Sequence, residues 1–177
     1  MRFTKVKATV FAIVLALGTI TLTPVKANAY TLTGCKWETK SPIISSRGVT
    51  GIYTTPLREA RLDINSKTPV NLKQSAYGTA WWAFNGDYGN TGWEGLAVWN
   101  CRNGKVLSAS SRLNNTFLSG KPAAQIKVVW LHELSHVFGL NHVTSINRVM
   151  YTSASAAYHH GVRSLTSDEI AAYEHLY

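Results

Sequence analysis

The sequence feature that most constrains this 177-residue chain is the stretch from His132 to His142, which reads HELSHVFGLNH. On a helix, His132 and His136 lie one turn apart on the same face, so both imidazoles can bind one ion. Gly139 can adopt a positive φ and turn the backbone sharply, which lets His142 approach the same ion. Three protein ligands leave a fourth position for water, which is typical of a catalytic rather than a structural zinc site.

Glu133 directly follows the first histidine, so its carboxylate can lie beside a water at the open position without binding the metal. That is the position of a general base. The alternative is a core helix that contains these residue types by chance, an objection that has force for a lone H-E-x-x-H. The glycine and the third histidine complete the longer pattern H-E-x-x-H-x-x-G-x-x-H, and this pattern favours the metal site.

The residues around the motif predict a helix over residues 123–138. Lys121-Pro122 precedes it, and proline suits a first turn. Its apolar residues recur with a helical period and leave a separate stripe for the ligands. They are Ile126, Val129, Trp130, Leu134, Val137 and Phe138. The ligands are therefore expected on a buried, rigid helix.

With this motif the chain resembles the metzincin metalloproteases and, among them, the matrixins of the M10 peptidase type. Metzincins carry a methionine in a tight turn beneath the zinc, and Met150 lies in Val149-Met150-Tyr151, similar to the V-M-Y of matrixins. The last residues, 165–177 (LTSDEIAAYEHLY), resemble the closing helix of a matrixin catalytic domain. The resemblance is specific over residues 121–177 and loose before them.

This resemblance implies a zinc endopeptidase with one catalytic Zn²⁺ and a protein or peptide substrate. The residues that it assigns to the site are the zinc ligands His132, His136 and His142, the catalytic base Glu133, and Met150 as a support rather than a ligand. It implies that the substrate lies extended along an edge strand within residues 95–100. Residues 151–158 would wall the pocket just beyond the scissile bond.

Some positions depart from these relatives. Thr152 stands where astacins and serralysins place a tyrosine ligand, which argues against those branches, and Val143 replaces the serine or threonine usual in matrixins. Segments like those that bind structural zinc and calcium in animal matrixins are not recognisable. The loop 85–90 (NGDYGN) has a single acidic residue, so it is expected to be a plain turn, and calcium binding stays open. His159-His160 is expected to be a surface pair.

The first residues predict a secretory signal peptide. Arg2, Lys5 and Lys7 precede an apolar run over residues 8–20, and Ala27-Asn28-Ala29 fits a cleavage site after Ala29. A membrane anchor is the weaker alternative because the run is too short to span a bilayer comfortably. We therefore expect a signal peptide over 1–29 and one catalytic domain over 30–177, in a small secreted, extracellular bacterial protein without a long pro-region.

The net charge of the chain limits the kinds of partner that we expect. The whole chain has a formal net charge of +9, and removal of its first 29 residues would leave 14 basic and 9 acidic residues, a net charge of +5. An ordinary basic surface is the simpler interpretation, and loose association with an anionic cell wall is the alternative. The basic residues are not clustered, so no nucleic-acid partner is expected. Stable membrane insertion is not expected either, and we expect a monomer.

Two cysteines, Cys35 and Cys101, are the only ones in the chain. In an oxidising compartment they predict one disulfide, which would tie the N-terminal segment to the middle of the sheet. The alternative is a latency switch, in which the Cys35 thiolate occupies the open zinc position, as in matrixin pro-regions. The flanking Thr33-Gly34 and Lys36-Trp37 lack the arginine and aspartate of that switch.

The order of predicted elements gives an α+β (mixed α/β) domain. Strands are expected within 36–49, 70–74, 79–84, 96–100 and 105–113, and a first helix over 54–64. Asn103-Gly104 predicts a hairpin turn. The resemblance implies a metzincin-like zincin fold with a twisted, mostly parallel five-stranded sheet, an active-site helix and a C-terminal helix.

Two further classes of function stay open beside the endopeptidase. One is a zinc hydrolase of cell-wall peptide bridges, and the other is a non-catalytic binding module on a protease fold. An intact Glu133 argues against the binding module, which needs no base. The tryptophans Trp81, Trp82, Trp93 and Trp99 suggest a sugar-stacking platform, but packing of the sheet is the favoured interpretation.

Overall fold

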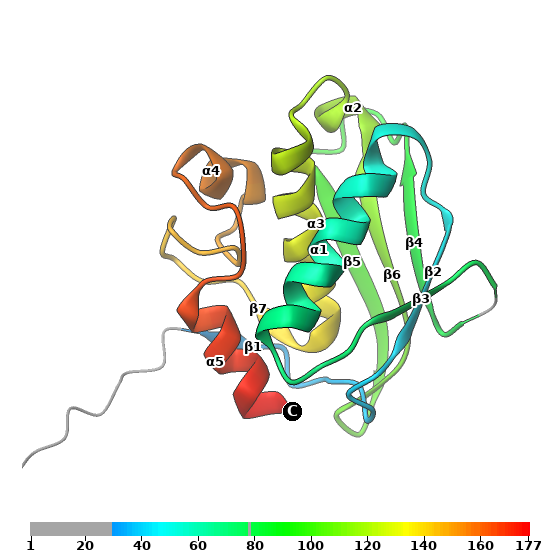
Figure 1. Cartoon of the computed structure of the whole chain (residues 1–177), viewed down its shortest axis with the longest axis vertical. Helices are drawn as coiled ribbons and strands as arrows, with labels where there is room; N and C mark the ends of the chain where they lie inside the picture. Colours follow the sequence, from blue (N-terminus) through cyan, green and yellow to red (C-terminus); the bar gives the residue numbers. More distant parts are fainter. Residues whose placement is uncertain (1–29, 78) are drawn as a thin grey trace, which may run out of the picture.

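The computed structural model describes residues 30–77 and 79–177, so the predicted signal peptide lies outside the described residues (Figure 1). The elements in chain order are β1 (Thr31–Leu32), β2 (Ile43–Gly48), the 3₁₀ turn η1 (Gly51–Tyr53), α1 (Thr54–Lys67), β3 (Lys73–Ser75), β4 (Trp81–Gly86), β5 (Gly95–Arg102), β6 (Lys105–Asn114), α2 (Asn115–Leu118), α3 (Ala123–Phe138), β7 (Leu140–Asn141), α4 (Ala154–His159) and α5 (Ser167–Leu176). No helix in these ranges is long and apolar enough to cross a membrane.

A five-stranded sheet forms one layer, in the order β3-β2-β4-β6-β5. Neighbouring strands are parallel except β5, which pairs antiparallel with β6 and forms one edge. The turn between β5 and β6 is Asn103-Gly104, with φ of 52° and 74°, as the hairpin prediction requires. The predicted mixed α/β fold with a mostly parallel five-stranded sheet is confirmed.

One face of the sheet is covered by α1 and α3, which lie side by side (Figure 1). Along β4, Trp81 and Ala83 are buried on this face, whereas Trp82 and Phe84 alternate onto the other face and stack on each other. The Trp81 ring packs edge-on against Phe138 of α3, and its Nε1 donates to Ser111 Oγ over 3.1 Å. These contacts fix α3 against the sheet.

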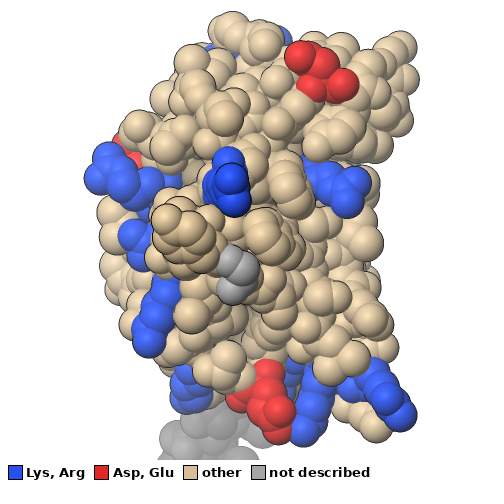
Figure 2. Space-filling view, turned by 90° about the vertical axis from the view of Figure 1, so that its right-hand side faces the viewer, with Lys and Arg blue, Asp and Glu red and all other residues tan. Residues whose placement is uncertain are grey.

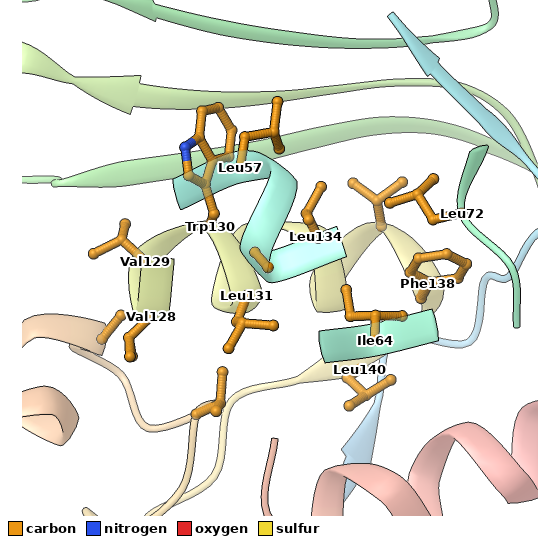
Figure 3. Packing of buried hydrophobic residues seen from close by; sticks show 14 of the residues in the cluster. Leu57, Ile64, Leu72, Val128, Val129, Trp130, Leu131, Leu134, Phe138 and Leu140 are labelled. Carbon is orange, nitrogen blue, oxygen red and sulfur yellow. The ribbon is translucent and has the colours of Figure 1, made fainter. Parts of the chain in front are cut away.

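The active-site helix of the sequence prediction, α3, has the predicted bounds and is the centre of the core (Figure 3). Trp130, Leu134 and Phe138 are fully buried and belong to the same cluster as Leu57 and Ile64 of α1. Each such side chain contributes roughly 1.5–3 kcal/mol on burial. Side chains on α3 are therefore held by a rigid support.

The strand predicted over residues 70–74 is displaced. Val70 and Leu72 are buried, but the strand itself is only Lys73–Ser75. The reason is α1, which continues beyond the predicted end at residue 64 to Lys67: Asn65 accepts the Leu72 N–H over 2.7 Å and donates to the Leu72 carbonyl over 3.1 Å. A helix side chain thus binds the backbone groups that a neighbouring strand would otherwise bind.

Cys35 and Cys101 form a disulfide with Cα atoms 6.2 Å apart. Cys101 belongs to β5, so the bond ties the N-terminal segment to the edge of the sheet. The prediction that the disulfide joins the middle of the sheet was wrong. The latency-switch hypothesis is also wrong for this structure, because Cys35 has no thiolate to offer a metal.

Charged side chains are scattered over the face of the molecule that Figure 2 shows. On the face shown in Figure 2, lysines and arginines are separated by uncharged residues, with a few acidic groups among them. This face therefore has no continuous basic patch of the kind that attracts nucleic-acid phosphates.

Replacing both cysteines, Cys35→Ala with Cys101→Ala, should lower the free energy of unfolding by about 4 kcal/mol, because the bond closes a long loop of the unfolded chain. Urea denaturation of both proteins measures the difference. The intact mass of the native wild type should also change on reduction, and alkylation of both thiols without reductant would contradict the bond.

Candidate active site

The third histidine is brought to the helix by a single glycine. Gly139 ends α3 with φ of 112°, in the left-handed region that favours glycine. A Cβ at this position would also lie 2.7 Å from the carbonyl oxygen of Cys35. The chain then turns into β7, which pairs with β1, and His142 follows directly. The predicted role of Gly139 therefore has a steric basis as well as a conformational one.

The Nε2 atoms of His132, His136 and His142 form a triangle with sides of 3.0, 3.0 and 3.1 Å. Among the described residues, this is the one group of three or more His, Cys, Asp or Glu side chains close enough to share an ion. Zn–N bonds of about 2.0–2.1 Å in tetrahedral geometry separate nitrogens by roughly 3.3 Å. The triangle therefore fits such an ion closely.

Hydrogen bonds to the outer nitrogens fix which ring atom carries the proton. His132 Nδ1 donates to the Val149 carbonyl over 2.7 Å, and His136 Nδ1 donates to the Leu140 carbonyl over 2.9 Å. Because carbonyls only accept, the neutral rings keep their lone pairs on Nε2, facing one another. Lone pairs that converge at this distance repel unless a cation lies between them. The donor set thus fits zinc.

The site also keeps these rings neutral. Burial, and then the nearby His136, lower the pKa of His132 to about 3. Burial lowers the pKa of His136 to about 4, and it lowers the pKa of His142 as well. Neutral imidazole is the form that binds metal.

Glu133 lies next to the triad and against the edge strand. It is 4 % exposed, and a Cβ on Gly95 of β5 would lie 2.3 Å from its Oε1. Burial, and then the charge of Glu94, raise the pKa of Glu133 well above its usual range, against the opposing effect of the Ala97 N–H that binds it. A carboxylate with a raised pKa is a stronger base once it has lost its proton.

The histidine triad and Glu133 lie in one cleft of about 710 Å³. Its walls are β5 with the loop before it on one side, and Thr152–Ser155 with His159 on the other. The triad and Glu133 lie between these walls, so a chain that entered the cleft would pass over them.

Comparison with known protein families agrees with this geometry. The family model described as Matrixin, of the M10 peptidases, matches residues 54–177. The chain belongs to the matrixin family. It is therefore a peptide hydrolase of a zinc-dependent family, and its histidine triad is in the expected arrangement. No match was found among curated protein sequences.

Sequence reasoning did not identify Glu94, which joins the two walls of the matrixin cleft. From the loop before β5, its Oε1 accepts the Ser155 N–H over 2.8 Å and the Ser153 hydroxyl over 3.4 Å, and its Oε2 accepts the Ser155 hydroxyl. Gln125 of α3 donates to Ser155 Oγ over 2.7 Å. These residues are far apart in sequence, so no local pattern indicates the network.

The turn around Met150 is buried and tied to α5. The Met150 N–H donates to Oε1 of Glu169 over 3.2 Å, and its carbonyl accepts the Val143 N–H over 2.9 Å. Glu169 is buried too, and its Oε2 completes a capping box with Thr166 at the start of α5. Thr166-x-x-Glu169 is the sequence signal that could have identified this residue.

The tryptophans divide between the core and the cleft. Trp81 is core, as the favoured interpretation predicted. Trp93 and Trp99 both line the cleft. Trp99 also packs against the core cluster, so the core interpretation was wrong for Trp93 alone. The ring of Trp99 stacks on His136 with centroids 6.4 Å apart. The aromatic residues of β5 and its loop are part of the site.

A buried amide holds the loop before β5. Asn114 Nδ2 donates to the carbonyl of Gly89 over 2.9 Å and to Thr91 Oγ1 over 3.0 Å, and its Oδ1 accepts the Tyr88 N–H over 3.2 Å. The Asn114 side chain thus fixes the loop at several points. The sequence does not indicate this role, because the polar residues involved are scattered along the chain. Exposed His159 and His160 form the expected surface pair.

Gly95→Ala should displace the Glu133 carboxyl, because the added Cβ occupies its position. We expect kcat to fall roughly tenfold to a hundredfold while zinc content stays unchanged. Gly86→Ala is the matched control, since a Cβ there meets only ordinary contacts of 3.4–3.5 Å with Tyr88. Steady-state kinetics and metal analysis of both variants provide the measurement. A Gly95→Ala enzyme with wild-type kcat would contradict the close approach of Gly95 to the Glu133 carboxyl.

Proposed function

We propose that this matrixin is a secreted zinc endopeptidase that hydrolyses internal peptide bonds of proteins or peptides. The observation that carries the proposal is the converging triad beside Glu133 in an open cleft bounded by an edge strand. His132, His136 and His142 would hold the ion. When bound, zinc supplies a Lewis acid that polarises a carbonyl and lowers the pKa of water.

Glu133 is the proposed general base. Its carboxylate takes a proton from the attacking water and then donates that proton to the amine that leaves. The Ala97 N–H and the close approach of Gly95 hold the carboxyl in position for both transfers. Met150 supports the site from its buried turn, and Val149 orients the His132 ring through the carbonyl.

Strand β5 is the proposed substrate-binding edge. The Ala97 N–H points away from β6 toward Glu133, whereas the Glu94 carbonyl accepts the Asn114 N–H on the β6 side. Since both backbone groups of one residue point the same way and neighbours alternate, Gly95, Ala97 and Trp99 present groups at the free edge. An extended substrate can add there as a further strand, with side-chain pockets choosing the sequence.

Secretion, with cleavage after Ala29, and a monomeric state complete the proposal. Support for an extracellular location comes from the signal-like first residues and from the disulfide, since such bonds persist in oxidising compartments. Loose cell-wall association would follow from the positive net charge alone and would weaken with salt.

A cell-wall peptide-bridge hydrolase is the second candidate, since the same site could act on another amide. The mature chain, residues 30–177, should release peptides from casein and no amines from purified peptidoglycan. The opposite pattern would favour the second candidate. Activity on neither substrate, with zinc bound, would favour a binding module.

Two substitutions should separate base from ligand. Glu133→Ala removes the proton acceptor but no imidazole, so it should retain about one equivalent of zinc while kcat/KM falls by several orders of magnitude. His136→Ala should lose zinc itself, because two remaining ligands hold the ion poorly. The zinc content and the rate of peptide hydrolysis are measured for both variants.

His160→Ala, an exposed histidine, is the control and should keep zinc and activity. In the wild type, 1,10-phenanthroline should abolish hydrolysis, and zinc or cobalt should restore it. A Glu133→Ala protein with near wild-type hydrolysis would show that another group is the base.

A further inference from the structure

The third histidine of the triad is the one whose ring is not oriented by a backbone carbonyl. His132 and His136 each donate through Nδ1 to such a carbonyl, whereas no described residue forms a hydrogen bond to Nδ1 of His142. His142 is also the most exposed of the three. The position of its ring therefore depends on how its backbone is held.

Residues 31–35, here called the N-terminal strap, hold that backbone. Strand β1 of the strap pairs antiparallel with β7, the strand that leads directly into the third histidine (Figure 1). The Thr33 N–H donates to the Gly139 carbonyl over 2.9 Å, and the Thr31 hydroxyl donates to the carbonyl of His142 itself. The N-terminal strap thus follows the chain from the end of α3 to the third ligand.

The N-terminal strap is anchored at its far end by a covalent bond. Cys35 is joined to Cys101 of β5, and the next residue, Lys36, is bound to the sheet. The Lys36 N–H donates to the Gly104 carbonyl over 3.0 Å, and its carbonyl accepts the Val106 N–H over 2.9 Å. Since β1 and β7 have two residues each, their pairing alone would be marginal. The disulfide therefore keeps this short ladder closed.

On the other side of the third histidine, the Val143 N–H donates to the Met150 carbonyl over 2.9 Å. The backbone of His142 is thus fixed from two directions, and only the side toward α3 depends on the N-terminal strap. We propose that the N-terminal strap positions His142 for zinc, with the Thr31 hydroxyl and the disulfide as its two points of attachment. The proposal rests on the proposed function, because it takes the triad to be the zinc site.

The dissociation constant for zinc tests the proposal without any measurement of hydrolysis. Thr31→Val keeps the branched shape of the side chain but removes the hydroxyl, so the dissociation constant should rise about fivefold, as expected for one hydrogen bond. Cys35→Ala with Cys101→Ala releases the anchor and should raise it about tenfold or more, as the loss of other groups that orient metal ligands does. Competition with a chromophoric chelator measures zinc binding, and circular dichroism verifies that each variant is folded.

Matched controls separate positioning from loss of stability. Thr68→Val removes a hydroxyl that donates to the Ile64 carbonyl over 2.8 Å at the end of α1, and it should bind zinc as the wild type does. Ile44→Ala truncates a fully buried side chain of β2 and destabilises the fold about as much as loss of the disulfide, yet it should keep the wild-type dissociation constant. When His142→Ala is already present, Thr31→Val should have no further effect, because the coupling between the two residues is gone.

Equal dissociation constants for the wild type and both strap variants would overturn the proposal and leave the endopeptidase intact. An equal weakening in Ile44→Ala would also overturn it, since loss of stability would then explain the effect. If the double cysteine variant does not fold, Thr31→Val decides alone, and an unchanged dissociation constant in that variant refutes the role of the N-terminal strap. A wild type that binds no zinc would overturn the proposed function and this proposal together.

Discussion

The convergence of three imidazole Nε2 atoms within about 3 Å of one another is the constraint on which the rest of this structure depends. Two of these rings are held in place by backbone carbonyls on different elements. Val149, in the methionine turn, holds His132, and Leu140, in β7, holds His136. These distant segments must therefore be folded for the two rings to be oriented toward a metal, so metal binding is coupled to folding.

The two segments that contain those carbonyls, β7 and the methionine turn, are themselves fixed by contacts with other elements. β7 is paired with β1, and the Thr33 N–H donates to the Gly139 carbonyl over 2.9 Å. The methionine turn is bound by Glu169, whose carboxylate at the same time caps α5. A buried carboxylate is tolerated here because it accepts hydrogen bonds from the Met150 N–H and from the N–H and hydroxyl of Thr166. The C-terminal helix thereby acts on the site without contacting it.

The sequence predicted the parts of the site that are local. Pro122 and Gly139 bound α3, the apolar period shows its buried face, and the histidine spacing predicts the triad. Gly95, Glu94 and Asn114 were not predicted, because each acts on a segment that is distant in sequence and none has a local signature. The strand predicted at residues 70–74 was misplaced for a related reason: the side chain of Asn65 on α1, rather than a strand, binds the Leu72 backbone.

Glu94 shows why the missed residues matter for chemistry. Its carboxylate binds the serines of the opposite wall, and from this position its charge also acts on Glu133. The same group thus sets the width of the cleft and disfavours ionisation of the base. A cation in the triad would act in the opposite direction, because it lies beside Glu133 and favours the carboxylate. Burial and then the charge of Glu94 therefore raise the pKa of Glu133, and a bound cation would lower it.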